Sequence, residues 1–155
     1  MTTLYLMCGP AGTGKSTWIE KEMRYQPGIC ISRDKIRFSL VQENEPYFSR
    51  EEDVFDEFIC NIQEAINDET CNNVFVDATH LTPVSRYKVL DRLNLTNVDI
   101  IPVNFIIPLE LNYQRNDCRT GRAKVPRSVI NNMRAIFTPA TEGEKYTYKE
   151  IINIY

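Results

Sequence analysis

The sequence predicts a single three-layer α/β domain with a parallel sheet of about five strands. Short apolar runs that end in a glycine or an acidic residue alternate with segments in which apolar residues follow the helical period. The length of 155 residues suits one domain. The hydrophobic share of 43% and the charged share of 25% are ordinary for a globular chain. The domain is therefore expected to span residues 1–155.

The strands and helices are expected to alternate along most of the chain. The expected strands are residues 3–8, 29–31, 73–77, 98–107 and 151–155. The expected helices are residues 15–25, 33–41, a long helix after Ser49, one that opens at Pro83, and residues 109–120 and 126–137. Ser32, Ser49 and Thr82 are expected to cap helices, since a hydroxyl can accept a hydrogen bond from a free backbone N–H. This alternation favours right-handed crossovers and a parallel sheet.

Composition argues against several other classes of protein. The five cysteines form no CxxC pair and there is one histidine, which is unlike a zinc site or a disulfide framework. No apolar run approaches the roughly 20 residues that span a bilayer, and no leader pattern is visible. We therefore expect a cytoplasmic protein with reduced thiols and no membrane partner. The oligomeric state is left open.

The charge is distributed unevenly although the net charge is only −3. From Glu20 to Glu69 there are 13 acidic and 6 basic residues, whereas from Pro83 to Ala135 there are 9 basic and 4 acidic residues. The basic half could meet phosphates, or it could be an ordinary solvated surface.

The strongest motif is GPAGTGKS at residues 9–16, which fits GxxxxGK[ST] without a mismatch. Glycines let the backbone curl so that its N–H groups point at a phosphate, and the next helix presents its positive end. Lys15 is expected to reach the β- and γ-phosphates and Ser16 to bind Mg²⁺. The expected nucleotide-binding residues are Gly9, Pro10, Ala11, Gly12, Thr13, Gly14, Lys15, Ser16 and Thr17.

This motif predicts a P-loop NTPase or kinase fold but does not specify a reaction. A GTPase would carry an NKxD motif, which is missing, and a mechanochemical ATPase would need a longer chain. A kinase is the compact alternative, with ATP and Mg²⁺ as cofactors.

Asp34 and Arg37 are candidate acceptor-side residues because they follow the second expected strand and share a helix face. Asp34 could take the proton of an attacking hydroxyl while Arg37 grips an acceptor phosphate. Equally, Asp34 could favour the helix N-terminus and pair with Arg37 on the surface.

Asp77 ends an apolar strand. An acidic residue at this place commonly supports Mg²⁺ through a water molecule. A residue that only caps a helix or forms a turn would show the same pattern. His80 could touch a substrate, but a structural role is favoured for a lone histidine in a loop.

Residues 115–126 form a basic segment that could act as a short helical lid over the triphosphate. Arg115 and Arg119 are four residues apart and Gly121 supplies a joint. Such arginines would neutralise charge in the transition state. The alternative is a solvated basic helix end.

Together these segments resemble the kinase domain of the bacteriophage polynucleotide 5′-hydroxyl kinases, over roughly residues 4–133. The resemblance rests on the phosphate loop, on SRDKIRFSLV, on VFVDATHLTP, and on LNYQRNDCRTGRAKVP. It implies ATP-dependent phosphorylation of a 5′-hydroxyl end of DNA or RNA. More distantly, the chain resembles small-molecule and zeta-toxin-like kinases.

The resemblance also implies a role for each matching residue. Lys15, Asp34 and Arg119 would be catalytic, with Asp34 as the general base. Arg37 would bind the acceptor's 3′-phosphate, and Asp77 and Thr79 would support the acceptor site. The nucleotide would be contacted by Arg115, Arg119 and Arg122. Either Arg119 or Arg122 could be the main lid arginine, because the segment before Val125 is one residue longer than in the family pattern.

Two alternatives to a polynucleotide kinase remain open at this point. One is a kinase for a small metabolite or sugar nucleotide, and the other is a nucleotide-binding module without transfer. Tyr87 and Tyr113 could stack on a base or pack in the core.

Overall fold

The computed structural model describes residues 1–155 and contains one five-stranded sheet. Its strands are β1 (Thr2–Cys8), β2 (Ile29–Ser32), β3 (Asn73–Asp77), β4 (Val98–Phe105) and β5 (Ile152–Ile154). They are ordered β2-β3-β1-β4-β5, and every neighbouring pair is parallel. The predicted fold class is therefore confirmed.

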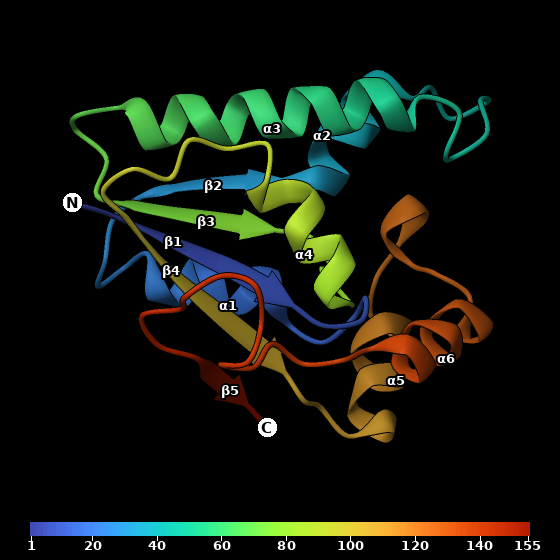
Figure 1. Ribbon diagram of the computed structural model, residues 1–155. Coiled ribbons are helices and arrows are strands. Elements are labelled where there is room, and N and C mark those ends of the chain that lie inside the picture. The colour runs from blue at the N-terminus through green and yellow to red at the C-terminus, as the bar shows by residue number, and fades with distance from the viewer.

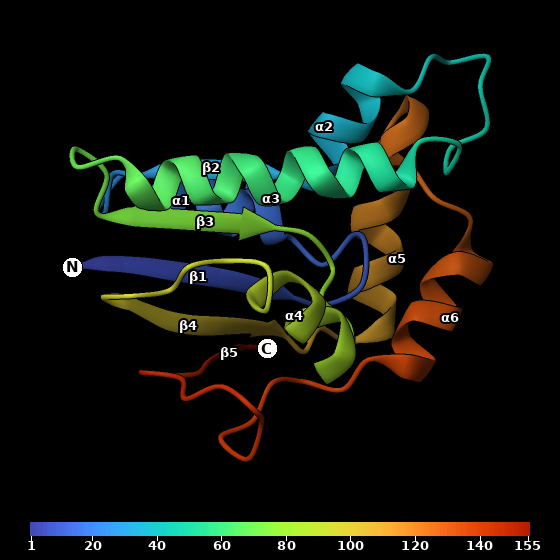
Figure 2. The same cartoon turned by 45° about the horizontal axis from the view of Figure 1, so that its top comes forward.

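The helices lie on both faces of this sheet and at the end towards which its strands point (Figure 1). They are α1 (Lys15–Glu22), α2 (Arg33–Leu40), α3 (Glu51–Asn67), α4 (Pro83–Leu90), α5 (Leu109–Asp117) and α6 (Arg127–Ile136), with a 3₁₀ turn η1 (Gly121–Ala123). The long helix α3 covers one face and α1 the other, while α5 and α6 stand at the carboxyl ends of the strands (Figure 2).

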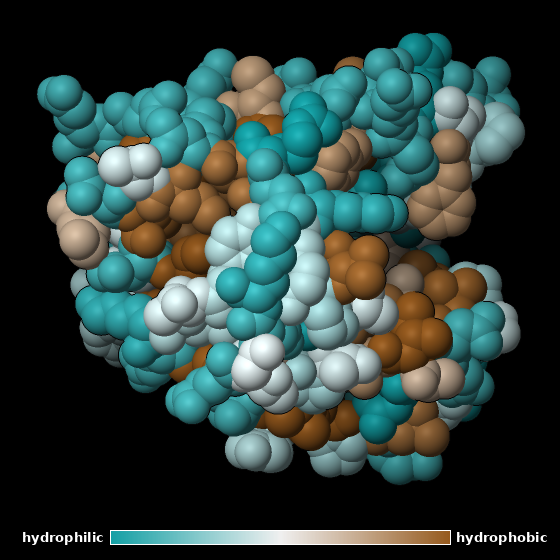
Figure 3. Space-filling view, in the orientation of Figure 1, coloured by the Kyte–Doolittle hydropathy of each residue, from teal (hydrophilic) through white to brown (hydrophobic).

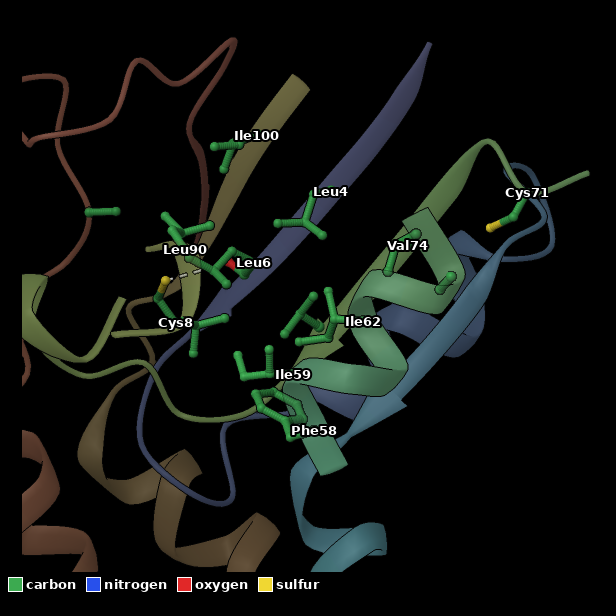
Figure 4. Close-up of a cluster of buried hydrophobic side chains, with 14 residues drawn as sticks. Leu4, Leu6, Cys8, Phe58, Ile59, Ile62, Cys71, Val74, Leu90 and Ile100 are labelled. Carbon is green, nitrogen blue, oxygen red and sulfur yellow. Dashed lines mark hydrogen bonds between the residues drawn. The ribbon is translucent and has the colours of Figure 1, made fainter. Parts of the chain in front are cut away.

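Strand β1 is buried on both faces, which explains its continuous apolar sequence. Leu4, Leu6 and Cys8 belong to a cluster with Phe58, Ile59 and Ile62 of α3 (Figure 4). The alternate residues Tyr5 and Met7 point to a second cluster on the α1 side. Because successive side chains of a strand point to opposite faces, both layers are fixed by the same seven residues.

Local sequence signals decide most helix ends. The Ser32 hydroxyl accepts from the Lys35 N–H at 3.3 Å, and Thr82 forms a capping box with Ser85. The predicted Ser49 cap is wrong. Helix α3 has Arg50 at its N-cap without a side-chain bond, and three acidic residues in its first turn stabilise the positive helix end instead. Helix α1 is also shorter than predicted and ends at Glu22.

The polar segment after Thr138 is held by a buried ion pair that the sequence analysis did not predict. The fully buried Arg86 donates to both carboxylate oxygens of Glu144, at 3.0 and 2.8 Å. The same guanidinium donates to the carbonyls of His80 and Thr138. Helix α4 is thereby joined to the loop after β3 and to the chain that leads into β5. No helix is both long and apolar enough to cross a bilayer.

Candidate active site

The loop between β1 and α1 has the backbone that its glycines permit. Gly12 and Gly14 have φ values of 78° and 92°, in the region that disfavours other residues. A Cβ atom at Gly14 would also lie only 2.9 Å from Nη1 of Arg115. These glycines therefore serve both the curl of the loop and the close approach of α5.

Lys15 lies inside this loop and is 6% exposed. Its Nζ donates to the carbonyl oxygens of Gly9 and Pro10, at 3.0 and 2.7 Å. Burial lowers the pKa of Lys15 to about 8, while the nearby Asp77 carboxylate opposes that change. A poorly solvated ammonium gains strongly from an anionic partner, which suits a phosphate-binding group.

Ser16 and Asp77 are brought together as the sequence pattern suggests. The Ser16 hydroxyl donates to Oδ2 of Asp77 at 2.7 Å, since β3 lies directly beside β1. One hydroxyl and one carboxylate are the protein oxygens that P-loop enzymes use for Mg²⁺, which keeps water and phosphate as its other ligands. This donor set fits Mg²⁺.

Helix α5 is fastened to the phosphate loop by Asn112, which the sequence did not single out, and by Arg115, which was expected to contact the nucleotide. Asn112 donates to the Ala11 carbonyl at 2.7 Å, and Arg115 donates to the Thr13 carbonyl at 2.6 Å. Asn112 and Asn116 are fully buried although both are polar. Their spacing with Arg115 puts all three on one helix face, a signal that was available in the sequence.

A cavity of about 630 Å³ lies beside the loop, between α1, the ends of β4 and β5, and α5. Trp18, Phe105 and Ile154 supply apolar walls. Thr17 and Arg115 also line it. Its volume is in the range of small-molecule sites, and it opens next to the phosphate loop. A nucleoside attached to phosphates in the loop would enter this cavity.

Arg119 and Arg122, the two candidates for the main lid arginine, differ in their contacts. Arg119 lines the cavity and has one hydrogen bond, to the Ala123 carbonyl at 3.2 Å. Arg122 instead donates to the carbonyls of Val41 and Phe38, at 2.7 and 3.2 Å. It therefore caps the C-terminal end of α2, which leaves Arg119 the freer of the two.

On the acceptor side, the two oxygens of Asp34 have different environments. Oδ1 accepts from Nη1 of Arg37 at 2.6 Å and from the Tyr47 hydroxyl at 3.1 Å. Oδ2 has no hydrogen-bond partner in the protein, and the side chain is 58% exposed. One oxygen is thus anchored while the other faces solvent.

Arg37 is more enclosed than a surface partner of Asp34 would be. Its side chain is only 8% exposed, and Glu51 accepts from its Nε and Nη2 at 2.6 and 3.0 Å. Burial acts to raise the pKa of Glu51, but the hydrogen bonds from Arg37 outweigh it and hold that pKa below its ordinary value. With Asp34 and Tyr47 on Nη1, all three guanidinium nitrogens are partnered.

Glu51 and Tyr47 carried no detectable signal in the sequence. Glu51 lies 14 residues beyond Arg37, across a loop, and reads as one more acidic residue in the first turn of α3. Only the fold brings it to Arg37.

The loop after β3 is tied to the phosphate loop. The Thr79 carbonyl accepts from the Gly9 N–H at 2.8 Å. His80 is 4% exposed, and its Nδ1 lies 2.6 Å from the Met7 carbonyl. Burial lowers the pKa of His80 to about 4, so the ring is neutral. The structure thus places His80 in the interior rather than on an accessible surface.

Tyr87 and Tyr113, which could stack on a base or pack in the core, both use their hydroxyls in hydrogen bonds within the protein. The Tyr87 hydroxyl accepts from the Lys145 N–H, and the Tyr113 hydroxyl donates to Asn131. The charges of Asp77, Arg119 and Asp34 all act on the pKa of Lys15.

Comparison with known proteins gives the family. Residues 4–140 match the AAA_33 family, described as an AAA domain. The chain belongs to this family. Together with the site, the match identifies a P-loop kinase domain. A search of curated proteins gives no match.

Several solved structures share the fold. A fungal RNA kinase is 15% identical, with a TM-score of 0.67 over 99% of this chain and 38% of that one. The Pnkp1/Rnl/Hen1 RNA repair complex contains a chain that is 21% identical, with a TM-score of 0.72 over 93% of this chain and 50% of that one. A gluconokinase from Sinorhizobium meliloti 1021 is 16% identical, with a TM-score of 0.59 over 99% and 82%. This chain spans no more than half the length of the first two.

Proposed function

We propose that this domain transfers the γ-phosphate of ATP to the 5′-hydroxyl of a polynucleotide, with Asp34 as the general base. The observation that carries the proposal is the asymmetry of Asp34. Its Oδ1 is fixed by Arg37 and Tyr47, whereas Oδ2 is free to accept a proton. A base must be held in place and still offer one open oxygen to the hydroxyl.

In this mechanism the acceptor oxygen attacks the γ-phosphorus while the bond to the β–γ bridging oxygen breaks, so that ADP leaves. The hydroxyl proton passes to Oδ2 of Asp34. Lys15 holds the β- and γ-phosphates, and Arg119 swings from its single carbonyl contact onto the transferring group. Mg²⁺, held by Ser16 and through water by Asp77, would neutralise phosphate charge when bound.

The polynucleotide acceptor is supported by the sequence resemblance and by the RNA kinase and RNA repair structures that share the fold. Arg37 would bind the acceptor's 3′-phosphate, for which Glu51 must yield one of its two hydrogen bonds. Thr79 would line the same acceptor site.

A second candidate, phosphorylation of a small neutral acceptor such as a sugar, is favoured by one observation. Glu51 and Asp34 neutralise Arg37, so this arginine is not free to bind an acceptor phosphate. A gluconokinase, a small-molecule kinase by its name, also shares the fold.

Labelled ATP separates the two candidates. The protein is incubated with γ-labelled ATP, Mg²⁺ and either 5′-hydroxyl DNA and RNA oligonucleotides or a panel of sugars, sugar nucleotides and nucleosides. We expect label on the oligonucleotides, in which the 5′-terminal nucleotide carries a 3′-phosphate, and less on the nucleosides, which lack it. Label on a sugar but on no oligonucleotide would replace the first candidate with the second. Label on neither, with ATP bound, would support a non-catalytic module.

A further inference from the structure

The loop between α2 and α3, residues 41–50, carries an exposed aromatic residue beside the candidate base. Phe48 is 68% exposed. Single exposed apolar residues are common on protein surfaces and need no function. This one differs because its neighbours connect it directly to Asp34.

Tyr47 makes that connection. Its hydroxyl donates to Oδ1 of Asp34 at 3.1 Å, and its ring meets the Phe48 ring edge-to-face, with centroids 4.7 Å apart at 88°. The Arg37 guanidinium lies 4.8 Å from the Tyr47 ring centre and 5.5 Å from that of Phe48. The Phe48 ring is therefore separated from Asp34, the candidate general base, by one aromatic side chain, that of Tyr47.

The charges around the loop suit a single terminal nucleobase rather than a long stretch of nucleic acid. Glu45 is paired with Arg50 at 3.3 Å, and Glu43 adds a further negative charge. Acidic residues repel a run of phosphates, but a base stacks through its uncharged face. The surface is notched between this upper part of the molecule and the α5–α6 region below it (Figure 3).

We propose that Phe48 is a platform on which the terminal nucleobase of the acceptor stacks, and that Tyr47 sets the distance between this platform and Asp34. The proposal rests on the polynucleotide kinase function. A nucleoside bound this way would place its base on Phe48 and its 5′-hydroxyl at Oδ2 of Asp34. Tyr47 is a positioning residue, since it acts through Asp34 and Phe48.

The test compares 5′-hydroxyl oligonucleotides that carry or lack the terminal base, at saturating ATP. Phe48→Ala should raise the acceptor KM by about 5- to 150-fold, the usual range for loss of one base–aromatic stack, with kcat and the KM for ATP unchanged. Phe48→Trp should restore the KM. Removal of the terminal nucleobase should raise the acceptor KM of the wild type by a similar factor and should leave the acceptor KM of Phe48→Ala unchanged.

Tyr47→Phe keeps the ring but removes the hydroxyl, so kcat should fall by about tenfold while the acceptor KM stays constant. Tyr25→Ala is the matched control, because Tyr25 is 84% exposed and lies beyond α1, away from this loop. Melting temperatures verify that each variant is folded.

Equal KM values for base-bearing and base-free ends, or an unchanged KM in Phe48→Ala, would overturn the platform and leave the proposed function intact. Failure of the wild type to label any oligonucleotide would instead overturn the proposed function, and the platform with it.

Discussion

On the donor side, the phosphate loop lies between a buried strand and a helix and is braced by α5, whereas on the acceptor side Asp34 stands on an exposed first turn. The donor contacts are mostly to backbone: Lys15 and Arg115 both donate to loop carbonyls. The acceptor contacts are between side chains, among which Glu51 and Tyr47 hold Arg37 and Asp34.

This difference follows from what each side has to bind. A triphosphate has the same shape in every reaction, so a fixed cradle of N–H groups serves it. Acceptors vary, and paired side chains on a loop can change without disturbing the fold. We therefore expect substitutions on the donor side to abolish transfer and those on the acceptor side to shift its selectivity.

The largest effect is expected for Lys15→Ala. In the proposed mechanism this variant removes the charge that holds the β- and γ-phosphates, and kcat/KM for labelled phosphate transfer should fall by roughly 10³-fold. Lys149→Ala, which removes an exposed lysine paired with Asp99, is the control and should stay near wild type. A loss below tenfold in Lys15→Ala would break the assignment of the donor side.

The lid arginines should differ in size of effect. Arg119→Ala should lower kcat by roughly 10²-fold, since it removes a cation from the transferring group. Arg122→Ala should cost less than about tenfold, because Arg122 contacts the end of α2 rather than the nucleotide cavity. Steady-state rates for both variants decide this, and a larger loss for Arg122→Ala would reverse the assignment.

ATP affinity should depend on pH through Lys15. With its pKa at about 8, Lys15 is charged at pH 7 and mostly neutral at pH 9. The charged fraction falls by about tenfold over this interval, and ATP affinity should fall by a similar factor. Calorimetry across this range measures it. Lys15→Met should bind ATP more weakly than the wild type, and its ATP affinity should not change between pH 7 and pH 9. A wild-type ATP affinity that is constant over this range would contradict the prediction.

The smallest effect is expected for Glu51→Gln, which frees Arg37. The KM for acceptors with a terminal 3′-phosphate should fall by about fivefold, while acceptors without it stay unchanged. Parallel kinetics with the two acceptors measure this. Equal changes for both would show that Arg37 does not meet that phosphate.

Glu51→Gln should also change acid stability. The pKa of Glu51 in the folded protein lies below its ordinary value of 4.5. Ionised Glu51 therefore stabilises the folded state fully above pH 4.5, and this stabilisation is lost as the pH falls through the pKa of the folded protein. The variant should melt below the wild type at pH 7, and the gap should narrow towards pH 3. A gap that is constant with pH would mean that the Arg37 pair does not stabilise the fold.

The sequence predicted the fold class, and it singled out the phosphate loop, because both depend on local patterns. Alternating apolar segments give the parallel sheet, and Gly9 to Ser16 determine their own loop. The Ser16–Asp77 contact was also within reach, because adjacent parallel strands end at the same edge.

Of the four side chains that interact around Asp34, the sequence singled out only two. Asp34 and Arg37 share a helix turn, but Glu51 and Tyr47 reach them across a loop whose path no local rule fixes. The Arg86–Glu144 pair escaped for the same reason, since 58 residues separate its partners.

The most direct test of the account is a single-turnover experiment with Asp34→Asn at saturating ATP and 5′-hydroxyl acceptor. Asparagine keeps the shape of the side chain and cannot take the proton. We expect unchanged ATP binding and a transfer rate at least about 100-fold below wild type, with the exposed Asp53→Asn variant unaffected. A transfer rate within a few-fold of wild type in Asp34→Asn would contradict it.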